Sequence, residues 1–452
     1  MHSECIIESR RDQTVKNLPV VSSDKQHSGE KQLRRKIFAN ALIVVIAVLL
    51  TLILLEVAVR LAGSTDDDGR FTLLNFTLEA QNLPVNELRG QVEGYIANKD
   101  IAVVIYDEWM GWTFRPNSVR QGGTFTINSA GFRSRRDFDQ SPPADTLRIA
   151  VFGDSFTAGD DVNDDEVWGY LLERELNEAG IRSEVLNFGV GAYGMGQAYL
   201  RWQHLGKSFS PDIVIFGLQP ENLKRNVNVF RQLLHRSGPA FSKPRFALID
   251  DELQLLNVPT LPPEQLMDVF ENFGDHPLAP FEFYYQSRFR AARWWSASRL
   301  ISLVFEALRQ AEGEPDIYTP GSEGGELGKA IIDAFAQDVL EDDAEFIVLH
   351  LPLQSHLIRY FSNLPRPRPV YDFLLEHSRE SYHYIPFEEH LQPMHVDDEY
   401  WSATKHYGPP LHAHLADIVA NEIATCIESG DCRLTRFDDI SAFMTAEATT
   451  DS

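Results

Sequence analysis

The chain has 452 residues, of which 66 are acidic and 41 basic, and its formal net charge is −25 at pH 7. This length exceeds one typical domain, and a hydrophobic content of 43% is sufficient for a large core. The acidic balance argues against nucleic acid as a partner, because binding to the phosphate backbone needs a positive surface.

The first predicted element is a transmembrane helix over residues 37–60. The run from Ile37 to Leu55 is interrupted only by Asn40 and Thr51, and it is long enough to cross a bilayer. A signal peptide would have a shorter apolar region followed by a cleavage site of small residues. We therefore expect an uncleaved anchor in the lipid bilayer, preceded by a cytoplasmic tail over residues 1–36.

The charges on the two sides of this helix predict its orientation. Residues 1–36 carry a small positive net charge, and the basic residues closest to the span are Lys31, Arg34, Arg35 and Lys36. The remainder of the chain is strongly acidic. Because cytoplasmic flanks of membrane helices are rich in Lys and Arg, we expect the amino terminus in the cytoplasm and the main domain outside it, periplasmic or extracellular.

Composition divides the rest of the chain into a stem, a main domain and a tail. Residues 61–145 contain short alternating runs that predict one or two strands packed on the main domain. The main domain is expected over 146–432, with an insertion over about 235–328 that is rich in proline and aromatic residues and contains a hairpin at 243–257. Residues 433–452 have little to bury and are expected to be mobile.

Strand and helix signals alternate along the main domain, which predicts a parallel sheet covered by helices. The expected strands are Leu147–Phe152, Ser183–Asn187, Ile213–Leu218, Glu345–Leu351 and Tyr382–Ile385. Apolar stripes at helical spacing over 168–176 and 411–423 predict helices that pack in the core. The predicted fold class is therefore α/β, with a parallel sheet of about five strands.

The three cysteines agree with this topology. Cys5 lies in the expected cytoplasmic tail, whereas Cys426 and Cys432 lie outside. These two either close a small disulfide loop, as an oxidising compartment permits, or remain two buried thiols. No spacing of Cys and His resembles a structural zinc site, and we predict neither a metal nor a cofactor.

The first predicted strand runs directly into Gly153, Asp154 and Ser155, so Ser155 is expected where a strand ends. Ligands bind at that edge of an open α/β sheet, and Gly153 permits a tight turn that would lift the hydroxyl into a cleft. The same residues also suit an ordinary strand-to-helix connection with an N-cap. The segment 153–159, Gly-Asp-Ser-Phe-Thr-Ala-Gly, resembles the first block of the SGNH (GDSL) hydrolase superfamily, whose nucleophile is that Ser.

The resemblance implies that a histidine activates Ser155, because a hydroxyl is a poor nucleophile until a base takes its proton. The segment around His406 is similar to the fifth block of the superfamily, in which a His precedes a turn and the last helix. His395, His412 and His414 are competitors, and the position ahead of the last helix favours His406. The superfamily usually has an Asp three residues before this His, where the present chain has Ala403.

The acid of the catalytic set therefore remains open. Either a main-chain carbonyl orients the imidazole in a Ser/His dyad, or an acid reaches in from Asp397, Asp398 or Glu399. Among these we select Asp398. The choice matters because the group that holds the correct tautomer contributes a large rate factor in a full triad.

Two further blocks resemble the oxyanion hole of the superfamily. The second block would supply a backbone N–H from Ala192, where the superfamily usually has Gly. In the third block Asn222 is the counterpart of the Asn that donates its side-chain amide. Gln219 and Asn226 are alternatives, because the spacing in this block is longer than usual. The expected donors are therefore Ser155, Ala192 and Asn222.

The resemblance implies a three-layer α/β/α, flavodoxin-like fold with a large insertion after the third strand. It also implies serine-dependent ester hydrolysis or acetyl transfer on an extracytoplasmic carbohydrate or polysaccharide ester, because membrane-anchored members often act on such substrates. One alternative is a non-catalytic module that binds polysaccharide or scaffolds an envelope complex. A further alternative is a lipase or thioesterase that acts on acyl chains.

Overall fold

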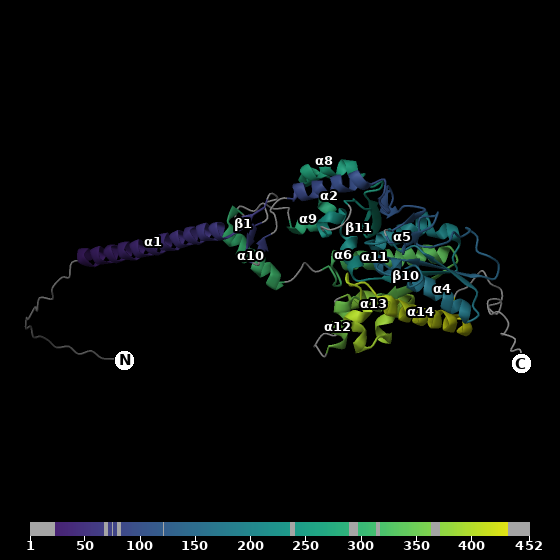
Figure 1. Cartoon of the computed structure of the whole chain (residues 1–452). Helices are drawn as coiled ribbons and strands as arrows, with labels where there is room; N and C mark the ends of the chain where they lie inside the picture. The colour runs from purple at the N-terminus through teal and green to yellow at the C-terminus, as the bar shows by residue number, and fades with distance from the viewer. Residues whose placement is uncertain are drawn as a thin grey trace, which may run out of the picture.

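The computed structural model describes most of the chain between residues 23 and 432. The described residues are 23–66, 71–74, 76–78, 83–120, 122–235, 240–288, 297–312, 317–362 and 371–432. The first 22 residues of the expected cytoplasmic tail and the expected mobile tail at 433–452 lie outside these ranges. A long helix leads into a body in which helices surround a sheet (Figure 1).

Helix α1 spans Ser23–Ala62, so it begins well before the predicted range of 37–60. Its segment Leu33–Ala62 is the one stretch in the described ranges that is long and apolar enough to cross a membrane, and none of that stretch is buried. The carboxylate of Glu56 accepts hydrogen bonds of 2.9 Å from the backbone N–H groups of Arg299 and Leu300. The end of α1 thereby caps helix α10 (Arg299–Glu312).

The stem consists of short antiparallel pieces. Its elements are β1 (Ser64–Thr65), β2 (Phe71–Leu73), β3 (Phe76–Leu78), α2 (Val85–Asn98), β4 (Val104–Asp107), β5 (Gly111–Phe114), β6 (Ser118–Val119) and β7 (Thr126–Ile127). Strands β4 and β5 pair with each other, as do β6 and β7. Trp112, Phe114 and Ile127 are buried in the same hydrophobic cluster as Phe152 of the main sheet. The predicted packing of this stretch on the main domain is therefore present.

The main sheet has five strands, all parallel. They are β8 (Leu147–Phe152), β9 (Ser183–Asn187), β10 (Ile213–Leu218), β13 (Glu345–His350) and β14 (His383–Pro386), in the order β14-β13-β10-β8-β9. These bounds agree with the predicted strands to within a residue. The chain moves to one side of β8 for β9 and to the other side for β10. The carboxyl ends of β8 and β10 therefore form the switch point at which ligands bind in doubly wound sheets.

Both faces of the sheet are covered, which gives three layers. Along β8, Ile149 and Val151 belong to one buried cluster, and Ala150 and Phe152 belong to the other. This alternation arises because successive side chains of a strand point to opposite faces. Helices α5 (Met195–His204), α11 (Glu323–Glu341) and α13 (Asp372–Ser381) cover the face of Phe152, and α4 (Trp168–Glu178) and α14 (Pro409–Ser429) cover the other. The predicted α/β/α fold is confirmed.

The stretch between β10 and β13 contains the predicted hairpin. Strands β11 (Arg245–Ile249) and β12 (Glu252–Leu256) pair antiparallel, and Asp250 and Asp251 turn between them with left-handed φ angles of 53° and 64°. The remaining helices are α3 (Ser155–Ala158), α6 (Glu221–Asn226), α7 (Arg231–Leu234), α8 (Leu266–Glu271), α9 (Phe283–Arg288) and α12 (Gln354–Phe361). The 3-10 helices are η1 (Gly206–Phe209), η2 (Pro263–Gln265), η3 (Phe273–Asp275), η4 (Ala279–Phe281), η6 (Phe387–His390), η7 (Pro393–Val396) and η8 (Asp398–Tyr400).

Cys426 and Cys432 form a disulfide, with their Cα atoms 5.2 Å apart. Of the two alternatives left open by the sequence, the bridged form is the one present. The bridge ties the last turn of α14 to the residues that follow Gly430, whose left-handed φ of 74° ends the helix.

Candidate active site

The turn between β8 and α3 presents Ser155 at the edge of the sheet. A Cβ atom at Gly153 would lie 2.2 Å from Thr157 Oγ1 and 3.0 Å from the carbonyl oxygen of Gly217, so only glycine fits there. Asp154 Oδ1 accepts a hydrogen bond of 2.9 Å from the N–H of Phe156 and thereby caps α3. Ser155 is the first residue of this short helix and faces a cavity.

The other oxygen of Asp154 ties this turn to α6. Asp154 Oδ2 accepts hydrogen bonds from Arg225 Nη1 at 2.7 Å and from Asn222 Nδ2 at 3.1 Å, and the whole of Asp154 is buried. Because buried charges must be paired to be tolerated, this ion pair fixes the turn with little freedom. Asp154, Arg225 and Asn222 therefore position Ser155.

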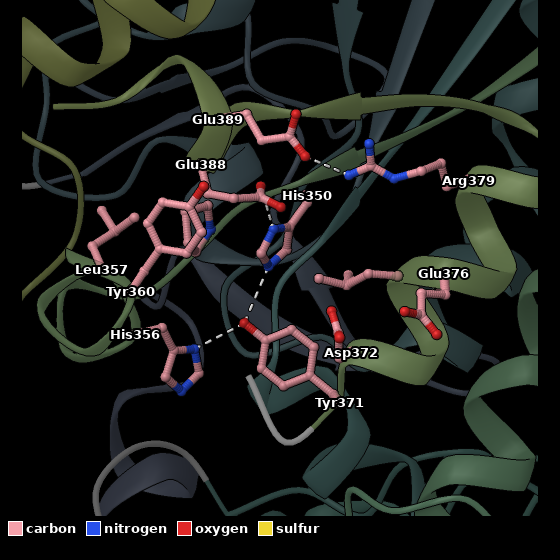
Figure 2. A pocket seen from close by; sticks show the side chains of 12 residues that line it. His350, His356, Leu357, Tyr360, Tyr371, Asp372, Glu376, Arg379, Glu388 and Glu389 are labelled. Atoms are coloured by element: carbon pink, nitrogen blue, oxygen red, sulfur yellow. Dashed lines mark hydrogen bonds and ion pairs between the residues drawn. The ribbon is translucent and has the colours of Figure 1, made fainter. Parts of the chain in front are cut away.

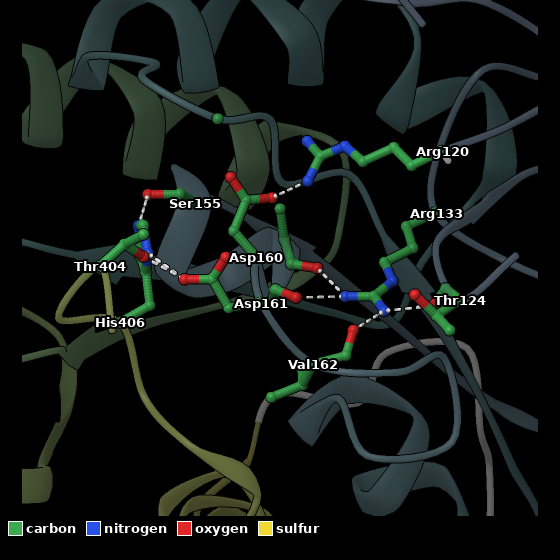
Figure 3. Close-up of polar contacts among 12 residues, drawn as sticks. Arg120, Thr124, Arg133, Ser155, Asp160, Asp161, Val162, Thr404 and His406 are labelled. Atoms are coloured by element: carbon green, nitrogen blue, oxygen red, sulfur yellow. Dashed lines mark hydrogen bonds and ion pairs between the residues drawn. The ribbon is translucent and has the colours of Figure 1, made fainter. Parts of the chain in front are cut away.

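The imidazole of His406 lies against Ser155. His406 Nε2 is 2.8 Å from Ser155 Oγ (Figure 3). The loop that carries His406 is closed by a bridge between Trp401 and Tyr407 and by a hydrogen bond of 2.8 Å from the N–H of Ser402 to the carbonyl of His406. The predicted pair thus meets at the carboxyl end of the sheet, although the two residues are 251 positions apart.

Asp161 completes the set. Its Oδ2 atom is 3.0 Å from His406 Nδ1, and it also accepts hydrogen bonds from the hydroxyls of Ser402, at 2.8 Å, and Thr404. Burial acts to raise the pKa of Asp161, but the hydrogen bonds from Thr404, Ser402 and His406 outweigh it and leave the pKa below the usual 3.8. The carboxylate is therefore ionised at neutral pH and accepts the Nδ1–H, which leaves the Nε2 lone pair facing Ser155.

The structure corrects the expected position of the acid. Asp398 does not contact His406: its Oδ1 accepts a hydrogen bond of 2.8 Å from Lys405 Nζ, and its side chain is 85% exposed. Asp161 lies in the loop after α3, only six positions beyond Ser155, and it is not among the acids that the segment near His406 led us to expect. Two features of the sequence point to it, namely the missing Asp at Ala403 and the acidic pair directly after the Gly-Asp-Ser segment.

Arg133 of the stem holds the Asp161 loop in place. Its guanidinium donates to the carbonyl oxygens of Ala158, Gly159 and Val162 at 2.7, 2.5 and 2.8 Å (Figure 3). In the same view the two neighbouring carboxylates turn apart, so that Asp160 pairs with Arg120 at 2.8 Å while Asp161 faces the imidazole. The stem thus contributes directly to the geometry of the site.

Of the three expected oxyanion donors, Ser155 and Ala192 line the cavity and Asn222 does not. Ala192 lines it together with Ser155 and has a left-handed φ of 65°, the conformation for which glycine is favoured. Asn222 is buried away from the cavity, because its amide donates to Asp154 Oδ2 and to the carbonyl of Tyr193, the latter at 3.2 Å. The expectation for Asn222 as a donor therefore finds no support in its contacts.

Gln219, one of the two alternatives, does line the cavity. Its Oε1 accepts a hydrogen bond of 2.7 Å from the N–H of Glu221, which turns the amide so that Nε2 is left over. Within the described ranges Nε2 has no hydrogen-bond partner. The other alternative, Asn226, is engaged through both amide atoms with Met195. Of the three amide side chains expected as donors or alternatives, Gln219 is the one that lines the cavity with Ser155.

The cavity at Ser155 has a volume of about 590 Å³, and most of the residues that line it have polar or charged side chains. Its apolar contributors include Phe156, Ala192 and Leu353. The charged or polar ones include Asp160, Gln219, Glu221, Arg225, Arg231, Gln354, Ser355 and Lys405. Among the competing histidines, His412 is fully buried, and burial lowers its pKa to about 3. It accepts from the N–H of Trp168 and has no part in the cavity.

A second cavity, of about 410 Å³, lies at the ends of β13 and β14. Figure 2 shows a chain of hydrogen bonds along its wall. Glu388 Oε2 is 2.6 Å from His350 Nδ1, His350 Nε2 is 3.1 Å from the hydroxyl of Tyr371, and that hydroxyl is 2.9 Å from His356 Nδ1. Burial lowers the pKa of His356 to about 4, so this imidazole is neutral at neutral pH.

No protein-family model and no curated protein matches the chain. Among solved structures it is similar to TesA, with 13% identity over 62% of this chain and 99% of the other and a TM-score of 0.34. It is also similar to an acetyl xylan esterase (12% identity, 61% and 100% covered, TM-score 0.33). A third is a lipase/acylhydrolase from Enterococcus faecalis (13% identity, 64% and 98% covered, TM-score 0.33).

Proposed function

We propose that the protein is an SGNH-type serine hydrolase that cleaves, or transfers the acyl group of, a carboxylic ester. The observation that carries this proposal is the contact of 2.8 Å between Ser155 Oγ and His406 Nε2, with Asp161 3.0 Å from the other ring nitrogen. A hydroxyl, an imidazole and a carboxylate in this order form a nucleophile, its base and the group that orients the base.

The first half of the reaction forms an acyl-enzyme. Ser155 Oγ attacks the ester carbonyl as His406 Nε2 takes its proton, and Asp161 stabilises the resulting imidazolium. The negative oxygen of the tetrahedral intermediate accepts hydrogen bonds from the N–H groups of Ser155 and Ala192 and from Gln219 Nε2. His406 then returns the proton to the alcohol oxygen, and the alcohol leaves.

The second half consumes the acyl-enzyme. His406 takes a proton from the acceptor hydroxyl, which attacks the acyl carbon, and then returns the proton to Ser155 Oγ. Water as the acceptor gives an esterase, and a sugar hydroxyl gives an acyltransferase. The two activities share every residue of the site, so they differ in what the cavity admits.

The chemistry of the cavity supports a short acyl group on a polar alcohol, such as an acetylated carbohydrate. The cavity is lined largely by charged and amide side chains, whereas a long acyl chain would need an apolar tunnel. Gln354 and Ser355 offer donors and acceptors of the kind that bind sugar hydroxyls. This arrangement disfavours the lipase and thioesterase alternative.

The location proposed for this activity is the outer side of a membrane. Helix α1 supplies a segment of sufficient length and apolar character, and the basic residues before it favour a cytoplasmic amino terminus. The disulfide between Cys426 and Cys432 is consistent with an oxidising compartment for the body of the protein.

The test is hydrolysis of p-nitrophenyl esters by the full chain in detergent. We expect turnover of the acetate ester, a decline from acetate to long acyl chains, and a loss of about 10³-fold or more in Ser155→Ala. Turnover that Ser155→Ala leaves unchanged, or no turnover at all, would instead favour the non-catalytic polysaccharide-binding or scaffold alternative. A preference for long chains would favour the lipase alternative.

A further inference from the structure

The cavity at Ser155 contains one arginine that no described group neutralises. Arg231 is the first residue of α7 and lines the cavity together with Ser155 and His406. Its Nη1 atom is buried and has no hydrogen-bond partner among the residues described. Buried donors are nearly always paired, because an unpaired one forfeits its bonds to water without replacement. The unpaired Nη1 therefore calls for a partner from outside the described residues.

The other charged side chains of this cavity all have ion-pair partners within the described ranges. The pairs are Asp160 with Arg120 (2.8 Å), Glu221 with Arg225 (3.3 Å) and with His235 (3.7 Å), Lys405 with Asp398 (2.8 Å) and His406 with Asp161 (3.0 Å). Arg225 is further held by Asp154 at 2.7 Å. Arg231 alone has no ion-pair partner among the described residues, and it lines the cavity in which the substrate would lie.

The groups around Arg231 leave its positive charge without a carboxylate partner that an incoming anion would have to displace. Burial lowers the pKa of Arg231 to about 10, Arg225 lowers it as well, and Glu221 acts in the opposite direction. The guanidinium is therefore still charged at neutral pH, although its surroundings stabilise it poorly. Glu221 does not satisfy it, because that carboxylate forms its ion pairs with Arg225 and His235. An incoming anion would relieve this desolvation and meet little competition from the chain's own carboxylates.

We propose that Arg231 forms a subsite for an anionic oxygen group, a carboxylate or a phosphate, carried by the ester substrate. The planar guanidinium matches both groups, since each presents two oxygens to its two donors. The proposal rests on the function proposed above and narrows it, so that the substrate is an ester of an acidic carbohydrate. The carboxylate of a sugar acid and the phosphate of a sugar phosphate are the two sources of this chemistry.

The first test compares three acetylated methyl glycosides with the acetyl group at the same position: a glucuronoside, its uncharged methyl ester, and a glucoside 6-phosphate. Acetate release by the full chain in detergent gives kcat/KM for each. We expect at least one anionic ester to exceed the uncharged one by about 10-fold or more, the range of a charge-assisted hydrogen bond. The better anion identifies the source. Equal or lower values for both anions would overturn the proposal.

Variants localise the effect. In Arg231→Gln the ratio of kcat/KM for the preferred anionic ester over the uncharged ester should fall about 10-fold, and Arg231→Lys should restore part of it. Lys405→Gln is the matched control, because it removes one positive charge from the same cavity where that charge is already paired. The control should keep the wild-type ratio. An equal fall in both variants would show a general field effect and refute the subsite. If the Arg231 variants do not fold, the wild-type ratio decides.

A third measurement separates this proposal from the function on which it rests. If no ester is turned over and a fluorophosphonate does not label Ser155, the proposed function fails on its own terms. The subsite is then judged by the thermal unfolding midpoint of the full chain with methyl glucuronoside, with its methyl ester or with methyl glucoside 6-phosphate. An increase with an anion alone, absent in Arg231→Gln, would support the subsite, and no increase with either anion would refute it.

Discussion

Two hydrogen-bonded triplets of hydroxyl, imidazole and carboxylate lie at the same edge of the sheet. The Ser155 triplet (Ser155, His406 and Asp161) follows β8, and the Tyr371 triplet (Tyr371, His350 and Glu388) lies at the end of β13. In the first, Ser155 opens onto a cavity, and the side chains of His406 and Asp161 are 22% and 33% exposed. In the second, the side chains of His350 and Glu388 are 2% and 11% exposed. The imidazole and the carboxylate of the Ser155 triplet are therefore far more accessible to solvent than those of the Tyr371 triplet.

The two hydroxyls also differ. The phenol of Tyr371 bonds to both His350 and His356, and burial, followed by the charge of Glu388, raises its pKa well above the usual value. The hydroxyl of Ser155 bonds to His406 alone among the described residues and lies beside free N–H donors. The order of hydrogen bonds alone therefore does not make a catalytic site. Access from a cavity and donors beside the hydroxyl are also needed.

The largest loss of activity is expected for the carboxylate of the Ser155 triplet. Asp161→Asn keeps the shape but no longer fixes the imidazole tautomer, so kcat should fall about 10² to 10⁴-fold in the p-nitrophenyl acetate assay. Asp398→Asn and Glu388→Gln are the controls and should stay within about threefold of the wild type. A larger loss in either control than in Asp161→Asn would contradict the assignment of the acid.

The next effect concerns the side-chain amide that shares the cavity with Ser155. Gln219→Ala removes an amide that lines the cavity with Ser155 and should lower kcat about 10² to 10³-fold with a smaller change in KM, because the proposed bond forms to the transition state. Gln219→Glu retains the size of the side chain but places a carboxylate there, and it should be at least as impaired. A change confined to KM would show that Gln219 binds substrate and does not stabilise the oxyanion.

For the Tyr371 triplet the predicted effect is on the stability of the fold. Glu388→Ala leaves the buried His350 with only Tyr371 as a hydrogen-bond partner and should lower the free energy of unfolding by about 1 to 3 kcal/mol. Urea denaturation measures this change, and kcat per folded molecule should remain close to the wild type. A strong loss of kcat at unchanged stability would mean that the Tyr371 triplet takes part in the reaction.

The smallest effect is a dependence of stability on pH. The pKa of Asp161 is lower in the folded protein than its usual 3.8, so its contribution to stability is complete above about pH 4 and is lost as the pH falls through the folded value. One third of the side chain is exposed, and the contribution should therefore be below about 1 kcal/mol. Urea titrations from pH 7 to 3 should show the advantage of wild type over Asp161→Asn shrinking, and a growing advantage would contradict this sign.

Much of the fold follows from the sequence, because the central strands are buried on both faces and therefore appear as short apolar runs. The runs at 147–152, 183–187 and 213–218 have the same bounds in the structure as in the prediction. The hairpin predicted over 243–257 follows from its turn residues, whereas the sequence left the bridge between Cys426 and Cys432 open against two buried thiols.

The site was less predictable where it depends on side chains from distant segments. Ser155 and His406 stand in recognisable local patterns, whereas Asp161 reaches His406 across 245 positions. The choice between Asp160 and Asp161 depends on a left-handed φ of 73° at Asp161 and on the grip of Arg133 on that loop. Neither feature is visible as a sequence pattern.

The most direct measurement is covalent trapping of the full chain with a serine-directed fluorophosphonate, followed by peptide mapping. We expect a single modified residue, Ser155, with labelling about 10³-fold slower in His406→Ala because the base is gone. Labelling at another hydroxyl, or no labelling of a folded protein, would contradict the claim that the Ser155 triplet is the active site.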